Sequence, residues 1–195
     1  MPKIVDHDMK RQEIIEKAKE VFAKRGYRNT NLSHISEKCG MGRTTLYQYF
    51  ANKDEIFYQT MRHTLEEIRS QVEAISIDEE LTITEKLKRI VHQLIGEGNN
   101  NHTFLLLLET WLVLKREKNE TLERLKEYII DLKLILEILI NKGIESKEIK
   151  QVDSKSLAET IYTLIETFTL QRTSNNIDIK AKIESFNLLI DGLKV

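Results

Sequence analysis

The fold is decided by residues 31–53, which read NLSHISEKCGMGRTTLYQYFANK. Leu32, Ile35 and Cys39 recur at spacings of three and four residues, so they share one face of a short helix. Asn31 stands just before them and can accept from the free backbone N–H groups of a first turn, as an N-cap. Gly40 ends the helix, because glycine reaches a positive φ without a Cβ clash.

The second half of the stretch predicts another short helix, which starts near Gly42 or Arg43 and turns Leu46 and Phe50 inward. Its other positions are nearly all hydrogen-bond donors and none is acidic: Arg43, Thr44, Thr45, Tyr47, Gln48 and Tyr49. This outer face suits a DNA major groove, where base edges and phosphates are mostly acceptors. The pattern therefore predicts a helix-turn-helix that binds duplex DNA.

Residues from about Met9 to Phe57 carry a combined motif. It consists of Gly26-Tyr27, Thr30, Ile35, Gly40, Thr45-Leu46-Tyr47, Tyr49-Phe50 and Lys53. The motif resembles the DNA-binding domain of the tetracycline-repressor (TetR) family of bacterial transcription regulators and covers roughly the first quarter of the chain. The departures are mild: Asn31 replaces the usual Thr or Ser, Ser36 and Cys39 stand where alanines are common, and Met41 where valine is.

The resemblance implies an all-α fold of two domains. Residues 1–53 would form a three-helix, helix-turn-helix DNA-binding domain, and residues 54–195 a larger helical domain for ligand binding and dimerisation. We expect Arg43, Thr44, Thr45 and Gln48 to read bases. We expect Tyr47, Tyr49 and Lys53 to contact phosphates, with Thr30, Asn31 and Gly42 completing the DNA-binding set.

The charge distribution agrees with this reading. The net charge is −1, yet residues 1–60 carry 11 basic and 8 acidic side chains, and residues 61–195 carry 19 and 23. From Lys24 to Lys53 there are six basic residues against Glu37 alone. A basic patch on an otherwise acidic protein is what phosphate-backbone binding requires. A solvated charged face is the simpler alternative, and charge alone does not decide between the two.

The location of the protein is also indicated by what the sequence lacks. Cys39 is the only cysteine, which excludes an intrachain disulfide and favours the cytoplasm. The first thirty residues contain no signal peptide, and no apolar run approaches the ~18–20 residues of a membrane span. We therefore expect a cytoplasmic protein without membrane contact.

Hydrophobic periodicity predicts about nine helices. Beyond the helix-turn-helix pair they cover residues 8–25, 53–75, 84–95, 104–114, 120–142, 154–172 and 177–193. Residues 104–114 are apolar on every face and should be buried, and 120–142 fits a central core helix better than a zipper. The resemblance implies that the last two helices form a four-helix interface in a homodimer. Periodicity alone shows two amphipathic helices, which would equally cover the protein's own core.

Enzyme chemistry finds no support in the sequence. None of the five histidines has a glutamate three residues before it, so no di-iron Glu-x-x-His pair exists. HExxH, a P-loop and a cysteine-based zinc site are absent as well. We therefore expect no catalytic residue, no metal site and no cofactor, although an all-helical carrier or enzyme with an incidental basic patch is a third hypothesis.

Two hypotheses concern the second domain. In the first, a small molecule enters the helical core and changes the tilt of the helix that starts at Lys53, which releases a homodimer from a palindromic operator. The resemblance favours a repressor, because the family mostly represses. The alternative is a DNA-binding dimer without a small-molecule effector, regulated by a protein partner.

Six polar or aromatic side chains are candidates for contact with the effector. They are His92, His102, Trp111, Tyr128, Tyr162 and Glu166. Each has a plainer interpretation, because a tyrosine or tryptophan among leucines is usually a core residue with a hydrogen-bonded polar tip. The apolar composition of residues 104–114 suggests a small, largely apolar effector.

Overall fold

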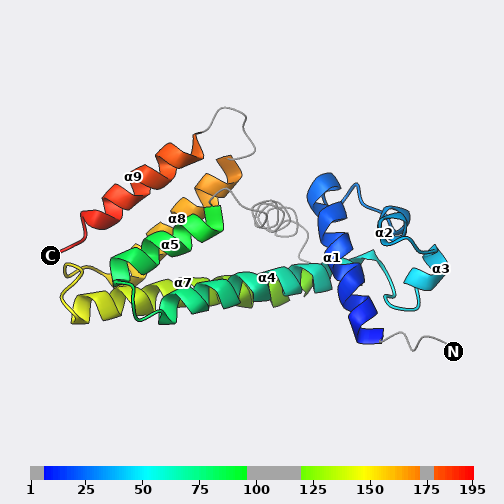
Figure 1. Cartoon of the computed structure of the whole chain (residues 1–195), viewed down its shortest axis with the longest axis horizontal. Helices are drawn as coiled ribbons and strands as arrows, with labels where there is room; N and C mark the ends of the chain where they lie inside the picture. The colour runs from blue at the N-terminus through cyan, green and yellow to red at the C-terminus, as the bar shows by residue number, and fades with distance from the viewer. Residues whose placement is uncertain (1–6, 96–119, 172–177) are drawn as a thin grey trace. The chain divides into compact units, whose positions relative to one another are not determined.

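The computed structural model describes residues 7–95, 120–171 and 178–195, the side chains of 120–130 excepted. These residues are helical apart from turns and one isolated antiparallel bridge between Ile149 and Lys194 (Figure 1). The helices are α1 (His7–Arg25), α2 (Leu32–Cys39), α3 (Arg43–Leu46), α4 (Lys53–Ile77), α5 (Ile83–Ile95), α7 (Glu120–Glu145), α8 (Ser154–Gln171) and α9 (Ile179–Asp191). The predicted all-α class is confirmed. Of the nine expected helices, the one over 104–114 lies outside the described residues.

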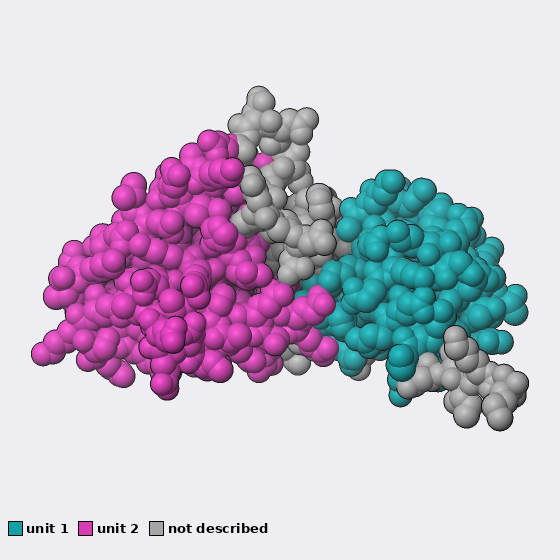
Figure 2. Space-filling view, viewed as in Figure 1, with its two compact units in different colours: residues 1–65, 109–125 teal, residues 66–108, 126–195 magenta. Residues whose placement is uncertain are grey.

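The chain divides into two compact units (Figure 2). Unit 1 comprises residues 1–65 and 109–125, and unit 2 comprises residues 66–108 and 126–195. The division falls inside α4, between Leu65 and Glu66, so one continuous helix begins in unit 1 and ends in unit 2. The domain boundary expected after Lys53 stays a prediction.

Unit 1 has a small aromatic core. Phe22 of α1 and Phe57 of α4 are almost fully buried, and their rings meet edge to face with centroids 5.0 Å apart. Leu46 and Phe50 point inward from α3 and the turn after it, as their spacing predicted. The helix-turn-helix is therefore packed on α1 and the start of α4.

Unit 2 has one apolar core to which five helices contribute. Its fully buried residues include Val72 of α4, Ile90 of α5, Leu136 of α7 and Ile165 of α8, and Phe186 of α9 is nearly so. The described part of α7 thus contributes to this core, as its periodicity indicated. None of the helices in the described ranges combines the length and the apolarity that a membrane span needs.

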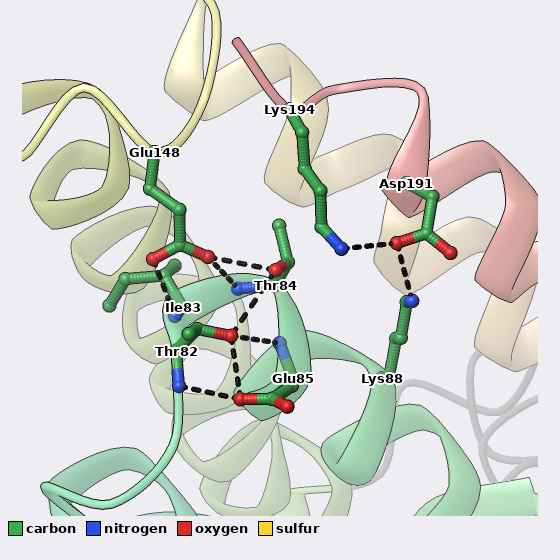
Figure 3. Close-up of polar contacts among 8 residues, drawn as sticks. All are labelled: Thr82, Ile83, Thr84, Glu85, Lys88, Glu148, Asp191 and Lys194. Carbon is green, nitrogen blue, oxygen red and sulfur yellow. Dashed lines mark hydrogen bonds and ion pairs between the residues drawn. The ribbon is translucent and has the colours of Figure 1, made fainter.

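The N-terminus of α5 is held by a residue far away in sequence (Figure 3). The Glu148 carboxylate accepts from the backbone N–H groups of Ile83 and Thr84, at 2.8 and 2.7 Å, and from the Thr84 hydroxyl at 2.8 Å. Asp191 at the end of α9 pairs with Lys88 of α5 at 2.7 Å. These contacts tie the start of α5 to the segment after α7 and the end of α9 to α5.

Candidate nucleic-acid interface

The start of α2 is fixed by a reciprocal pair of hydrogen bonds. The Asn31 side chain accepts from the backbone N–H of His34 at 3.0 Å, and the Asn31 N–H donates to His34 Nδ1 at 3.3 Å. This is a capping box with histidine in the position usually held by Glu or Gln. Gly40 closes the helix at φ 66°, so both predicted ends of α2 are confirmed.

The second helix of the motif is shorter than expected. The α-helix α3 covers only Arg43–Leu46, whereas its hydrophobic pattern predicted a helix as far as Phe50. The chain continues as a turn, in which the N–H of Gln48 donates to Thr45 O at 3.1 Å and that of Tyr49 to Leu46 O at 3.0 Å. Both are bonds between residues three apart, which wind the backbone more tightly than the four-residue spacing of an α-helix.

The outer side of α3 and its turn forms a continuous exposed surface, which we call the readout surface. It consists of Gly42, Arg43, Thr44, Thr45, Tyr47 and Gln48. Tyr47 is 50% exposed, a large fraction for an aromatic side chain. Tyr49 is half-buried beside it. Six of the ten predicted DNA-binding residues thus share one solvent-facing surface rich in donors.

Three predicted residues have structural contacts of their own. Thr30 is 2% exposed and its hydroxyl donates to Gly26 O at 2.8 Å, so that side chain closes the end of α1 instead of facing solvent. Asn31 is exposed, with its oxygen used in the α2 cap. The half-buried Lys53 donates to Tyr27 O at 3.1 Å and lies 4.2 Å from the centre of the Tyr27 ring. An ammonium carries three donors, so these contacts leave Lys53 capable of a phosphate bond.

Two residues of α1 at the edge of this surface were missed in the sequence. The Arg11 guanidinium donates to Tyr49 O and, at 3.1 Å, to Glu55 Oε1, and it lies 4.3 Å from the Phe50 ring centre. The rings of His7 and Tyr49 lie 4.6 Å apart. These contacts join positions about forty residues apart, which no local periodicity reveals.

The candidate effector contacts are only partly described. His102 and Trp111 lie outside the described residues, as does the side chain of Tyr128, and His92 is exposed on α5. Tyr162 and Glu166 are neighbours one turn apart on α8 and share a hydrogen bond. Burial and the Glu166 carboxylate raise the pKa of the Tyr162 phenol, so it is neutral. The Lys133 ammonium, which sequence reasoning missed, lies 4.6 Å from the Tyr162 ring centre.

Comparison with known proteins agrees with the geometry. A family model for bacterial regulatory proteins of the tetR family matches residues 14–60. The fatty acid metabolism regulator protein of Bacillus subtilis is 30% identical over 190 residues, which is 94% of this chain and 95% of the relative.

Solved structures match along nearly the whole chain. The transcriptional regulator FadR of Bacillus subtilis, in complex with stearoyl-CoA, is 25% identical, with a TM-score of 0.73 over 92% of this chain and 96% of that one. A TetR-family regulator from Cytophaga hutchinsonii, 23% identical, has the same fold, with a TM-score of 0.83 over 99% and 98%. The named relatives are transcriptional regulators.

Proposed function

The chain belongs to the TetR family of bacterial transcriptional regulators, and from that premise we propose that it is a homodimeric repressor released from its operator by a long-chain acyl-coenzyme A. One observation carries the class of effector. The Bacillus subtilis FadR that the chain resembles along almost its whole length holds stearoyl-CoA. The name of the Bacillus subtilis relative suggests that the regulated genes serve fatty acid metabolism.

The readout surface is the part of the molecule that we propose to enter the major groove. Arg43 is exposed at the start of α3 and can donate two parallel hydrogen bonds to a guanine edge. Tyr47, Tyr49 and Lys53 would fix the domain on the phosphates. Two copies of the motif in a dimer would read a palindrome whose half-sites lie one or more helical turns apart.

Dimerisation is proposed to use α8 and α9. Leu188 and Leu189 of α9 are 73% and 63% exposed, which is costly for leucines facing water. A second copy that covers them would remove this cost, and a paired α8 and α9 from each copy would make a four-helix interface.

Release requires that the effector prefer the protein conformation that does not bind DNA. The proposed carrier of this preference is α4, which runs unbroken from Lys53 beside the readout surface to Ile77 in unit 2. An acyl-CoA that binds the DNA-incompetent state 100-fold more tightly contributes about 2.7 kcal/mol of coupling. That is enough to dissociate the protein from an operator that is only marginally saturated.

The test is a DNA-binding titration with purified protein. Duplexes recovered by binding-site selection are labelled, and affinity is measured by fluorescence anisotropy with and without stearoyl-CoA below its micelle concentration. Free coenzyme A and stearate are the matched controls, because each carries one half of the effector. We expect the operator affinity to fall at least about tenfold with stearoyl-CoA and to change little with either half. Operator binding that no acyl-CoA weakens would instead favour regulation by a protein partner.

A further inference from the structure

We propose that Arg11 is a positioning residue for operator recognition: from α1 it fixes the turn at residues 47–50 and thereby aims the readout surface. The inference rests on operator binding and is independent of the effector. Arg11 is half-buried and lies 32 positions before the first residue of α3, so its effect on DNA reading would be exerted through the turn that it holds.

The geometry gives Arg11 three separate contacts with the end of the motif. One guanidinium nitrogen donates to the backbone carbonyl of Tyr49 and another to Glu55 Oε1 at 3.1 Å. The guanidinium carbon, Cζ, lies 4.3 Å from the ring centre of Phe50. A planar guanidinium can donate from two separate nitrogens while its face lies on the ring, whereas a lysine must make every contact from one nitrogen.

Glu55 extends this hold to the other end of the turn. Its second oxygen accepts from the backbone N–H of Ala51 at 2.7 Å, and its own N–H donates to the Asn52 side chain at 2.8 Å. Arg11 and Glu55 therefore fix the backbone at Tyr49 and Ala51, on both sides of Phe50. Arg11 and Glu55 together set the direction of the chain between α3 and α4.

The motif needs such a hold because α3 is a single turn. A helix of four residues has no stability of its own, and the carbonyl groups of Thr45 and Leu46 at its end accept from the turn that follows it. Burial of Leu46 and Phe50 sets how deeply the segment packs, but apolar contact is not directional. Hydrogen bonds are directional, so the bond from Arg11 to Tyr49 O, together with the backbone bonds of the turn, fixes the rotation of Tyr47 and Gln48, the two exposed residues between the buried anchors.

His7 supports the same turn from one helical turn earlier. It lies four positions before Arg11, on the same face of α1, and its ring is 4.6 Å from that of Tyr49. Two successive turns of α1 thus contact a single residue of the motif, one on its side chain and one on its backbone. This convergence is the observation that assigns α1 a role in aiming the surface as well as in packing.

The experiment compares discrimination, measured as the ratio of the dissociation constants for a scrambled duplex and for the duplex selected by the wild-type protein. Arg11→Gln removes the charge and the fork, Arg11→Lys keeps the charge alone, and Lys10→Gln removes a neighbouring α1 charge whose partner is Glu13 on the same helix. A loss of folded protein or of general positive charge weakens binding to both duplexes by the same factor and leaves the ratio of dissociation constants unchanged. For the wild-type protein this ratio must exceed one. A wild-type ratio of one would refute operator binding itself, which is a different outcome from a failure of the role proposed for Arg11.

We expect the ratio to fall about tenfold in Arg11→Gln and by a smaller factor in Arg11→Lys, with Lys10→Gln close to wild type. If Arg11→Gln does not fold, circular dichroism reveals it and the ratio for Arg11→Lys decides. Ratios in the folded Arg11 variants that equal the wild-type ratio overturn the proposal, and so does a matching fall in Lys10→Gln.

Discussion

Gly143 leaves no space for a side chain near the end of α7. A Cβ at this position would lie 2.7 Å from Ile149 Cδ1 and 3.1 Å from Ile83 Cγ2. Ile149 is 1% exposed, so it cannot move aside into solvent. We expect Gly143→Ala to lower the free energy of unfolding by about 1–2 kcal/mol in urea denaturation, because overpacking outweighs the higher helix propensity of alanine.

A second substitution isolates the cause. Ile149→Val removes Cδ1, the atom that the new methyl group would meet first. The double variant should therefore be more stable than the sum of the two single effects predicts. Simple additivity would show that the close approach at Gly143 does not limit stability.

Substitutions of Arg43 and Tyr47 should have different effects on DNA binding, one on base preference and the other on overall affinity. Arg43→Ala should relax the base preference at one position in a binding-site selection, because one bidentate arginine–guanine pair contributes about 1–3 kcal/mol of discrimination. Tyr47→Phe should weaken binding to every duplex alike, because a phosphate contact carries no base information. An unchanged preference in Arg43→Ala would contradict the role of Arg43.

At the scale of single helices, Asn31 caps α2 and is also predicted to contact DNA, and substitutions can separate the two roles. Asn31→Ala removes the oxygen that accepts from the His34 N–H and should cost about 1 kcal/mol of stability. Asn31→Asp keeps an acceptor there, so the thermal midpoint should stay near that of the wild type while DNA affinity falls through charge repulsion. Equal DNA affinity in the aspartate variant would place Asn31 away from the duplex.

The start of α5 should make stability depend on pH through Glu148. Partial burial raises the pKa of this carboxyl, but hydrogen bonds from Thr84 and Ile83, with the charge of Lys194, hold it below the ordinary 4.5. A carboxyl whose pKa is lower in the folded state stabilises fully above pH 4.5, and this contribution is lost as the pH falls through the folded value. Glu148→Gln should thus cost about 1–3 kcal/mol at neutral pH and progressively less in acid.

Urea denaturation of the wild type and Glu148→Gln across this pH range measures the difference. Glu145→Gln is the matched control, because Glu145 is an exposed carboxylate at the end of α7. The free-energy gap between wild type and Glu148→Gln should close below pH 4.5, and the gap for Glu145→Gln should stay small. A gap for Glu148→Gln that does not change with pH would exclude its carboxylate as the cause.

The contrast between Asn31 and Arg11 shows what the sequence alone can predict. Asn31 and Gly40 bond to neighbours within four residues, and the inward face of Leu46 follows from its spacing to Phe50, so caps and helical faces could be predicted from local pattern. The contacts of Arg11 with Tyr49 and of Glu148 with Thr84 depend on how distant segments pack, and no local rule contains them. Thr30 is a third case, because its hydroxyl bonds to Gly26 O only four residues earlier, although the pattern of the sequence did not reveal its burial.

At the scale of the whole molecule, two helices run from one unit into the other: α7, between Leu125 and Lys126, and α4, which also carries Lys53. The residues of α4 pass from Leu65 in unit 1 to Glu66 in unit 2 without a break in the helix. A rigid helix transmits a change at one end to the other, whereas a hinge absorbs it. The rigidity of α4 should therefore determine the coupling free energy between effector binding and operator binding.

Glu66→Gly tests this coupling at the point where the units divide. Glu66 is exposed, so the substitution should leave the cores of both units intact, while glycine weakens the helix by about 1 kcal/mol relative to alanine. If stearoyl-CoA weakens operator binding 100-fold in the wild type, we expect only about tenfold weakening in Glu66→Gly, a loss of about 1.4 kcal/mol of coupling. Anisotropy titrations with each ligand alone should give unchanged affinities.

Glu66→Ala, which removes the same charge without loosening the helix, should keep the full coupling. Equal coupling in the glycine and alanine variants would mean that effector and operator communicate without α4.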